Sequence, residues 1–91
     1  MMISIGYRNY IAVNRIVSII SPDSRPTKNL INGAREIGKL IDATMGKKTK
    51  SVIISDSNHV ILSANSPDTI VHRTQAVSKK MIHVEDGWQK K

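Results

Sequence analysis

The side chains best suited to chemistry lie in the stretch MGKKTKSVII, Met45–Ile54. Lys47, Lys48 and Lys50 crowd behind Gly46, and a run of β-branched residues follows them. Glycine permits a tight or left-handed turn and lets a phosphate approach the backbone closely. Lysine attracts phosphate as a point charge, so it contributes little to the recognition of particular bases. The stretch predicts either a phosphate-contacting loop on a hairpin stem or a solvated turn that keeps a sheet edge soluble.

No catalytic or metal-binding constellation accompanies these lysines. The segment GAREIGKL, Gly33–Leu40, falls short of the P-loop pattern because Leu40 replaces the hydroxyl that must ligate magnesium. Asp56, Ser57 and His59 are neighbours in a tight turn, which cannot supply the geometry of a hydrolase triad. The histidines also lack a third ligand at metal-binding spacing. We therefore expect no enzyme activity, no cofactor and no metal.

The composition is that of a small, strongly basic and aliphatic domain. The 91 residues carry 14 Lys and Arg against 7 Asp and Glu, which gives a net charge of +7. An excess of this size suggests a polyanionic partner, of which nucleic acid is the commonest. The sequence has no cysteine, and its apolar runs are far shorter than the ~20 residues that span a bilayer. We expect a cytoplasmic protein without disulfides, with no membrane partner and no small-molecule substrate.

Four segments are rich in β-branched residues and are predicted to be strands: Met2–Ile5, Tyr10–Ile20, Ser51–Ser55 and His59–Ala64. Turn-forming residues separate the last two segments, which predicts a hairpin. In the long second segment, apolar residues alternate until Arg15, which stands where a core residue is due. Either the strand bulges at this point or the Arg15 side chain points away from the core.

Two helices are predicted from their caps and apolar spacing. The first runs from about Pro26 to Ile37, behind Ser24 as N-cap and before Gly38 as a left-handed C-terminal cap. The second begins behind Ser66, with proline as its first helical residue and an aspartate that complements the helix dipole. The helices and strands together favour an α+β fold built on a small antiparallel sheet with two short helices.

The last part of the chain differs in composition from the rest. From Ala76 onward the residues become polar and charged, and the sequence ends in DGWQKK. Such a composition is typical of a frayed terminus or of a docking segment. We therefore divide the chain into one domain over residues 1–75 and a polar tail over residues 76–91.

Two long stretches resemble the RemA family of bacterial regulators. They are NRIVSIISPDSRPTKNLI, Asn14–Ile31, and GKLIDATMGKKTKSVIISDSNHVILSANSPDTIVHR, Gly38–Arg73. The SPDS turn, the LIDAT segment with its following glycine and basic pair, and the HVILS strand recur in the same order and at the same spacing. The resemblance covers the chain from about Met2 to Arg73 and leaves the tail outside.

The resemblance implies a nucleoid-associated, DNA-binding transcription regulator of biofilm matrix genes. Members of the family are similar to LytTR-type DNA-binding domains in fold, and they form heptameric or octameric rings that present basic loops to double-stranded DNA. The family's DNA-contacting arginine pair falls on Lys47 and Lys48, and another functional arginine falls on Arg15. Lysine retains the attraction to phosphate but puts bidentate base contacts in doubt. The predicted DNA-binding site consists of Arg15, Lys47, Lys48 and Lys50, with Gly46 shaping the loop.

Two other functions agree with the same sequence. One is general binding of RNA or other polyanions, although the chain has only two tyrosines and one tryptophan for stacking on single strands. The other is a structural oligomer in which the positive charge only maintains solubility. Competition among duplex DNA, RNA and heparin separates the first alternative from DNA binding, and the absence of any DNA complex at low salt favours the second.

Overall fold

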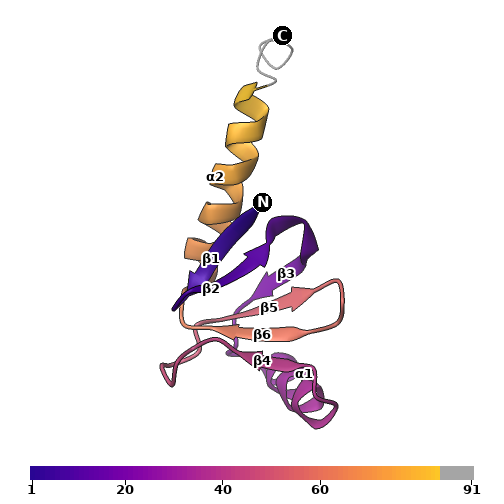
Figure 1. Ribbon diagram of the computed structural model, residues 1–91. Coiled ribbons are helices and arrows are strands. Elements are labelled where there is room, and N and C mark those ends of the chain that lie inside the picture. The colour runs from indigo at the N-terminus through magenta and orange to yellow at the C-terminus, as the bar shows by residue number, and fades with distance from the viewer. Residues whose placement is uncertain (85–91) are drawn as a thin grey trace.

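The computed structural model describes the backbone of residues 1–84 and the side chains of residues 1–76 (Figure 1). Within this part, the prediction of a small α+β domain with two helices is confirmed. The strands are β1 Met2–Gly6, β2 Asn9–Ala12, β3 Ile16–Ile20, β4 Leu40–Asp42, β5 Ser51–Ser55 and β6 Val60–Ser63. The helices are α1 Arg25–Glu36 and α2 Pro67–Val84, and one 3-10 turn, η1, covers Val13–Arg15.

The strands form two sheets. β1 and β2 pair as an antiparallel hairpin, and the other four strands form one sheet in the order β3-β5-β6-β4. β5 and β6 form the predicted antiparallel hairpin, but β4 pairs with β6 in parallel, so the larger sheet is mixed rather than antiparallel. Because β3 already occupies the outer side of β5, β4 joins the free side of β6. β4 was not among the predicted strands.

The long segment Tyr10–Ile20 does not form one strand. It divides into β2 and β3, with η1 between them, because the chain leaves the small hairpin here and enters the larger sheet. Arg15 is the last residue of η1, and its side chain is 65% exposed. The sequence left two alternatives open, and the structure has the one in which Arg15 points away from the core. The interruption between β2 and β3 is a turn of 3-10 helix. A register shift follows between Ile16 and Ser18.

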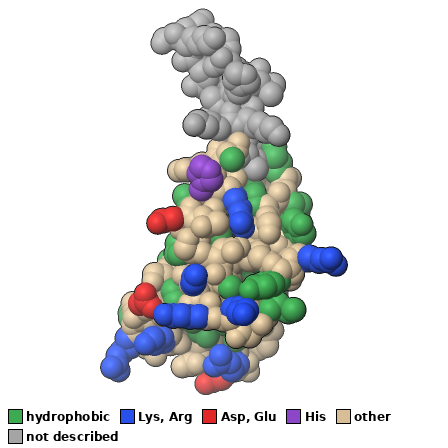
Figure 2. All heavy atoms as spheres, turned by 90° about the vertical axis from the view of Figure 1, so that its left-hand side faces the viewer, with side chains coloured by type: hydrophobic (Ala, Val, Ile, Leu, Met, Phe, Trp, Pro, Cys, Tyr) green, Lys and Arg blue, Asp and Glu red, His purple; other side chains and the backbone are tan. Residues whose placement is uncertain are grey.

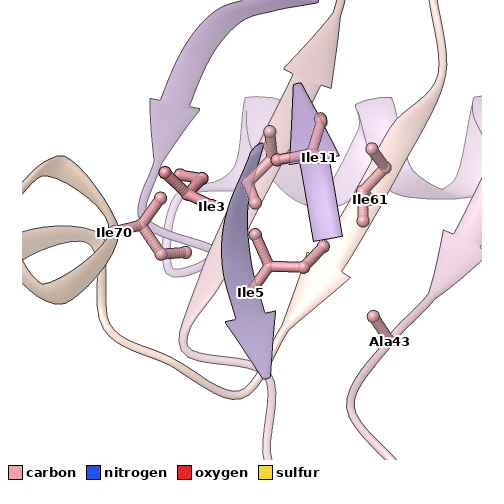
Figure 3. Close-up of a cluster of buried hydrophobic side chains, with 7 residues drawn as sticks. Ile3, Ile5, Ile11, Ala43, Ile61 and Ile70 are labelled. Carbon is pink, nitrogen blue, oxygen red and sulfur yellow. The ribbon is translucent and has the colours of Figure 1, made fainter. Parts of the chain in front are cut away.

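The hydrophobic core covers both faces of the four-stranded sheet. On one face, the β1–β2 hairpin and the first turn of α2 pack isoleucines against Ile53 and Ile61 (Figure 3). On the other face, Ala34 of α1 packs against Val52, Val60 and Leu62. Side chains alternate along a strand, so β5 and β6 contribute to both clusters. The result is a three-layer arrangement in which the central sheet is covered on each side (Figure 1).

Both predicted caps of the first helix are confirmed. The Ser24 hydroxyl accepts a hydrogen bond from the Thr27 amide at 3.3 Å. At the other end, Gly38 has a φ of +73°, and the amides of Gly38 and Lys39 donate to the carbonyls of Arg35 and Ala34. This pairing is a Schellman motif. The segment that resembles a P-loop is therefore the end of a helix and its cap.

The second helix is longer than predicted. Ser66 caps it as expected, because its hydroxyl accepts a hydrogen bond from the Thr69 amide, but the helix continues to Val84. The residues after Ala76 contain neither glycine nor proline before position 85, so their polarity alone does not end the helix. The predicted boundary between residues 75 and 76 thus falls inside α2, and residues 85–91 of the predicted tail lie outside the described part. Within the described part, no helix is long and apolar enough to cross a membrane.

Two glycine substitutions are expected to change stability in opposite directions. Gly38→Ala is expected to destabilise the fold by about 1 kcal/mol, because a Cβ is strained at positive φ. Gly33→Ala, in the middle of α1, is expected to stabilise it by about 0.5 kcal/mol. A Cβ meets no atom within 4 Å at either position, so backbone conformation alone decides the sign. Urea unfolding followed by circular dichroism measures both; a shift of the same sign would contradict the capping role of Gly38.

Candidate nucleic-acid interface

The topology of the larger sheet collects several basic segments at one end. β5 is antiparallel to β3 and β6, and β4 is parallel to β6. The C-terminal ends of β3, β4 and β6 therefore lie at the same end of the sheet as the start of β5. The β4–β5 loop, residues 43–50, crosses this end, and the first turn of α1 follows β3 there. Figure 2 looks onto this end of the molecule and shows Lys and Arg side chains gathered over the lower part of the view. We call this end of the sheet the basic end and define it by Arg8, Arg25, Lys28, Lys47, Lys48 and Lys50.

The β4–β5 loop is attached to β6 at both of its ends. The Ala43 amide donates to the Leu62 carbonyl and the Lys50 amide to the Ser63 carbonyl, each at 2.9 Å. The loop therefore spans from β4 to β5 across the end of β6. The sequence-based expectation that the β5–β6 hairpin is its stem was wrong, because β4 and β5 are not neighbours in the sheet.

A tight left-handed turn forms the tip of this loop. Gly46 has a φ of +78° and Met45 a φ of +53°, and the Lys47 amide donates to the Thr44 carbonyl at 3.0 Å. The left-handed turn expected at Gly46 is thus present. It reverses the chain within a few residues, so the lysine side chains start from a backbone of defined shape.

Asp42 fixes the beginning of the loop. One of its carboxylate oxygens accepts hydrogen bonds from the Thr44 hydroxyl at 2.6 Å and the Thr44 amide at 2.9 Å. These two hydrogen bonds lower the pKa of Asp42 below its ordinary value of 3.8, and the positive charge of Arg35 adds to the effect. The carboxylate is therefore charged at neutral pH and holds the first turn of the loop.

The predicted site lysines are exposed. Lys47, Lys48 and Lys50 all lie on the surface, whereas Thr44 at the base of the loop is buried. Among the described side chains, one ion pair is formed, between Arg15 and Asp56. The cations of the basic end thus form no ion pair with a carboxylate of the described residues, and their side chains are exposed.

Arg15 lies at the opposite end of the sheet from the lysines. It precedes β3, whereas the loop precedes β5, and these two strands are antiparallel. Its guanidinium pairs with the Asp56 carboxylate at 3.0 Å, and both side chains are largely exposed. The Asp56 amide also donates to the Arg15 carbonyl at 2.9 Å. Within one subunit the structure brings Lys47, Lys48 and Lys50 together and separates Arg15 from them.

A group of polar residues that the sequence did not single out connects the basic end to the rest of the fold. The buried hydroxyls of Ser51 and Ser63 donate to the carbonyls of Asn65 and Ile5 at 2.8 and 2.7 Å. The Arg73 guanidinium donates to the Ser4 carbonyl at 2.8 Å and to the Asn65 side chain at 3.0 Å. No spacing or motif marks these residues in the sequence, because their partners lie in distant segments.

Among the described residues no metal-binding cluster is found, and Asp56, Ser57 and His59 do not form a triad. No group of three or more His, Asp or Glu side chains in residues 1–76 converges on a point that a metal ion could occupy. The His59 ring contacts the Ser57 hydroxyl at 2.7 Å, and that hydroxyl contacts Ser55 at 2.8 Å, within the turn between β5 and β6. Asp56, in the same turn, pairs with Arg15 instead of the histidine.

Comparison with known proteins identifies relatives over nearly the whole chain. The sequence model of the RemA-like family, described as extracellular matrix regulatory protein A-like, matches residues 2–74. A protein of Acetivibrio thermocellus is 47% identical over 93% of this chain and 91% of its own length. A protein of Alkaliphilus oremlandii is 50% identical over 94% and 95%, and one of Desulfitobacterium hafniense is 55% identical over 82% of each. All three carry the name "Putative regulatory protein".

Replacing Asp42 is expected to destabilise the protein in a pH-dependent way. Because the folded state lowers the pKa of Asp42, the charged carboxylate stabilises folding above pH 3.8, and this contribution is lost as the pH falls through the folded pKa. Asp42→Asn is therefore expected to lower the free energy of unfolding by less than about 1 kcal/mol at pH 6, because solvent screens this exposed carboxylate, and by a smaller amount at pH 3. Denaturant unfolding of both proteins at the two pH values measures this; an equal difference at both would show that the charge does not hold the loop.

Proposed function

Because the chain belongs to the RemA-like family, we propose that it is a DNA-binding transcription regulator that contacts duplex DNA through its basic end. The observation that carries the proposal is the β4–β5 loop, in which exposed lysines stand on a backbone fixed at both ends. The relatives named as regulators support the same reading. The proposed targets, by family, are genes of the extracellular matrix, and the proposed place of action is the nucleoid.

The chemistry of the loop favours phosphates as its partner. Lysine ammonium groups neutralise phosphates without selecting bases, and each neutralised phosphate releases condensed counterions. Gly46 leaves open space next to the backbone, since a Cβ built there meets no atom within 4 Å. A phosphate can therefore approach the loop closely. Such contacts position the protein on DNA, and sequence preference must come from other residues.

The position of Arg15 favours an assembly of several subunits. If Arg15 and the lysine loop both serve DNA binding, a duplex that meets the basic end of one subunit needs Arg15 from another. The surface offers possible contacts, because the outer strands β3 and β4 have unpaired edges and Val17 on β3 is 65% exposed. These are two different edges, as a head-to-tail ring requires. We propose a homo-oligomeric ring, in which weak contacts of single subunits add through effective concentration.

Replacing Lys47 and Lys48 together with alanine is expected to weaken DNA binding and to reduce its salt dependence. For B-form DNA the log–log slope is about −0.9 per phosphate neutralised, so the loss of lysine–phosphate contacts flattens it. The double-alanine variant should bind DNA of many different sequences more weakly, to a similar extent for each. Replacement of both lysines with arginine should retain binding. Affinity across a salt series measures these effects, and stability should change by less than about 0.5 kcal/mol because the side chains are exposed.

The control removes a positive charge from the opposite end of the sheet, by Lys39→Gln, since Lys39 precedes β4 and its carbonyl accepts a hydrogen bond from the Val60 amide at the start of β6. It should leave the salt slope close to that of the wild type. If the double-alanine protein has an unchanged slope, the loop is a solvated turn and the proposed interface is wrong. If RNA or heparin displaces duplex DNA at equal charge concentration, the protein is a general polyanion binder.

Arg15→Ala is expected to weaken DNA binding while the assembly and the fold persist. The exposed ion pair with Asp56 contributes at most about 1 kcal/mol to stability, so the thermal transition should shift little. Light scattering coupled to gel filtration should give several times 10.1 kDa for both proteins. A wild-type monomer at micromolar concentration would contradict the ring, and a variant that no longer assembles would make Arg15 an interface residue.

A further inference from the structure

The turn between β1 and β2 has an unusual backbone for its sequence. Gly6 pairs with Asn9 in the hairpin, so Tyr7 and Arg8 form a two-residue connection. Both have positive φ, +53° and +65°. Two-residue hairpin loops with positive φ at both positions favour Asn-Gly or Gly-Gly, because a Cβ is strained in this conformation. Tyrosine and arginine therefore occupy the tip at a cost in stability.

The surrounding residues hold this strained turn in place. The Asn9 side-chain amide donates to the Gly6 carbonyl at 2.9 Å and to the Tyr7 carbonyl at 3.3 Å. The Ile5 carbonyl accepts the hydrogen bond from the buried Ser63 hydroxyl. The two tip residues lie outside both clusters of the hydrophobic core: Arg8 is exposed and Tyr7 is 48% exposed. Residues in a strained backbone conformation that the surrounding structure fixes tend to occur at functional sites.

The tip lies at the same end of the sheet as the lysine loop. A Cβ on Gly6 would be 3.2 Å from the Asn65 side chain, and the Asn65 carbonyl accepts the hydrogen bond from the Ser51 hydroxyl. Ser51 follows Lys50, whose amide is bound to the Ser63 carbonyl. The Ser63 hydroxyl in turn donates to the Ile5 carbonyl beside the tip, so Ser63 connects the hairpin tip to the end of the β4–β5 loop. No carboxylate of the described residues forms an ion pair with Arg8.

We propose that the β1–β2 tip is a second DNA-contacting element, in which Arg8 reads base edges in a groove beside the phosphates bound by the lysine loop. This inference rests on the proposed function. Arginine presents a planar fork that can form two hydrogen bonds to a guanine edge, which lysine cannot do in the same way. A rigid two-stranded hairpin can enter a groove of the duplex, and the exposed Tyr7 ring can pack on the sugars at its side. The tip thus supplies the sequence selectivity that the lysine loop lacks.

The decisive variant is Arg8→Gly, because it removes the guanidinium and relieves the backbone strain together. Its melting temperature, at matched protein concentration, is expected to rise by about 4–8 °C. The probes are a duplex selected from a random pool by the wild-type protein and an unrelated duplex of the same length. Affinity for the selected duplex is expected to fall about tenfold, and affinity for the unrelated duplex to fall much less. A protein that becomes more stable and binds less selectively cannot have lost binding through unfolding.

Two further variants separate charge from base reading. Arg8→Lys keeps the charge, and it should retain the affinity for the unrelated duplex but lose selectivity. Lys39→Gln removes one charge at the opposite end of the sheet and should retain both the affinity for the unrelated duplex and the selectivity. If Arg8→Gly or Arg8→Lys keeps the wild-type ratio of the two affinities, the inference is overturned while DNA binding stands. If the wild-type protein binds no duplex at low salt, the proposed function and this inference both fail.

Discussion

A buried hydrogen-bond network at the start of β5 determines which segments share the basic end. Ser51 and Ser63 lie opposite each other across β5 and β6, and their hydroxyls donate to carbonyls of Asn65 and Ile5. A buried hydroxyl without a partner costs roughly 1–3 kcal/mol. The network is therefore complete only when the β1–β2 hairpin and the start of α2 sit at this end of the sheet. Arg73, donating to Ser4 and Asn65, strengthens the same connection.

The network also explains how a small domain tolerates local strain at its surface. Tyr7, Arg8 and Met45 all have positive φ although none is glycine, and all three lie at or near the basic end. Each such residue costs of the order of 1 kcal/mol. These free-energy costs are offset by the isoleucine-rich core and by the hydrogen bonds that fix the β1–β2 turn and the β4–β5 loop. The proposed DNA-facing surface is thus shaped by buried residues that lie beneath it.

The aliphatic composition has a different consequence at the sides of the molecule. A chain of this size cannot cover all of its apolar surface, and Ile37, Ile41 and Val17 remain exposed. Their location on or beside the outer elements of the sheet is compatible with contacts between copies of the chain. Arg15 belongs to this question because, in the proposed ring, a neighbouring subunit brings it to the duplex that the lysine loop contacts.

The sequence by itself determined the features that depend on near neighbours. Ser24, Ser66 and Gly38 identify the helix ends, turn residues identify the β5–β6 hairpin, and Gly46 with its lysines identifies a basic left-handed loop. Caps and turns involve residues a few positions apart, so a linear sequence contains them.

Only the tertiary structure decided the parallel pairing of β4 with β6 and the division of Tyr10–Ile20 between two sheets. It also separated Arg15 from the lysines and joined Ser51, Ser63 and Asn65 to the hairpin. These features depend on which distant segments pair, and pairing is selected by burial and hydrogen-bond satisfaction over the whole domain. The charge of the site was therefore evident in the sequence, whereas the surface that presents this charge was not.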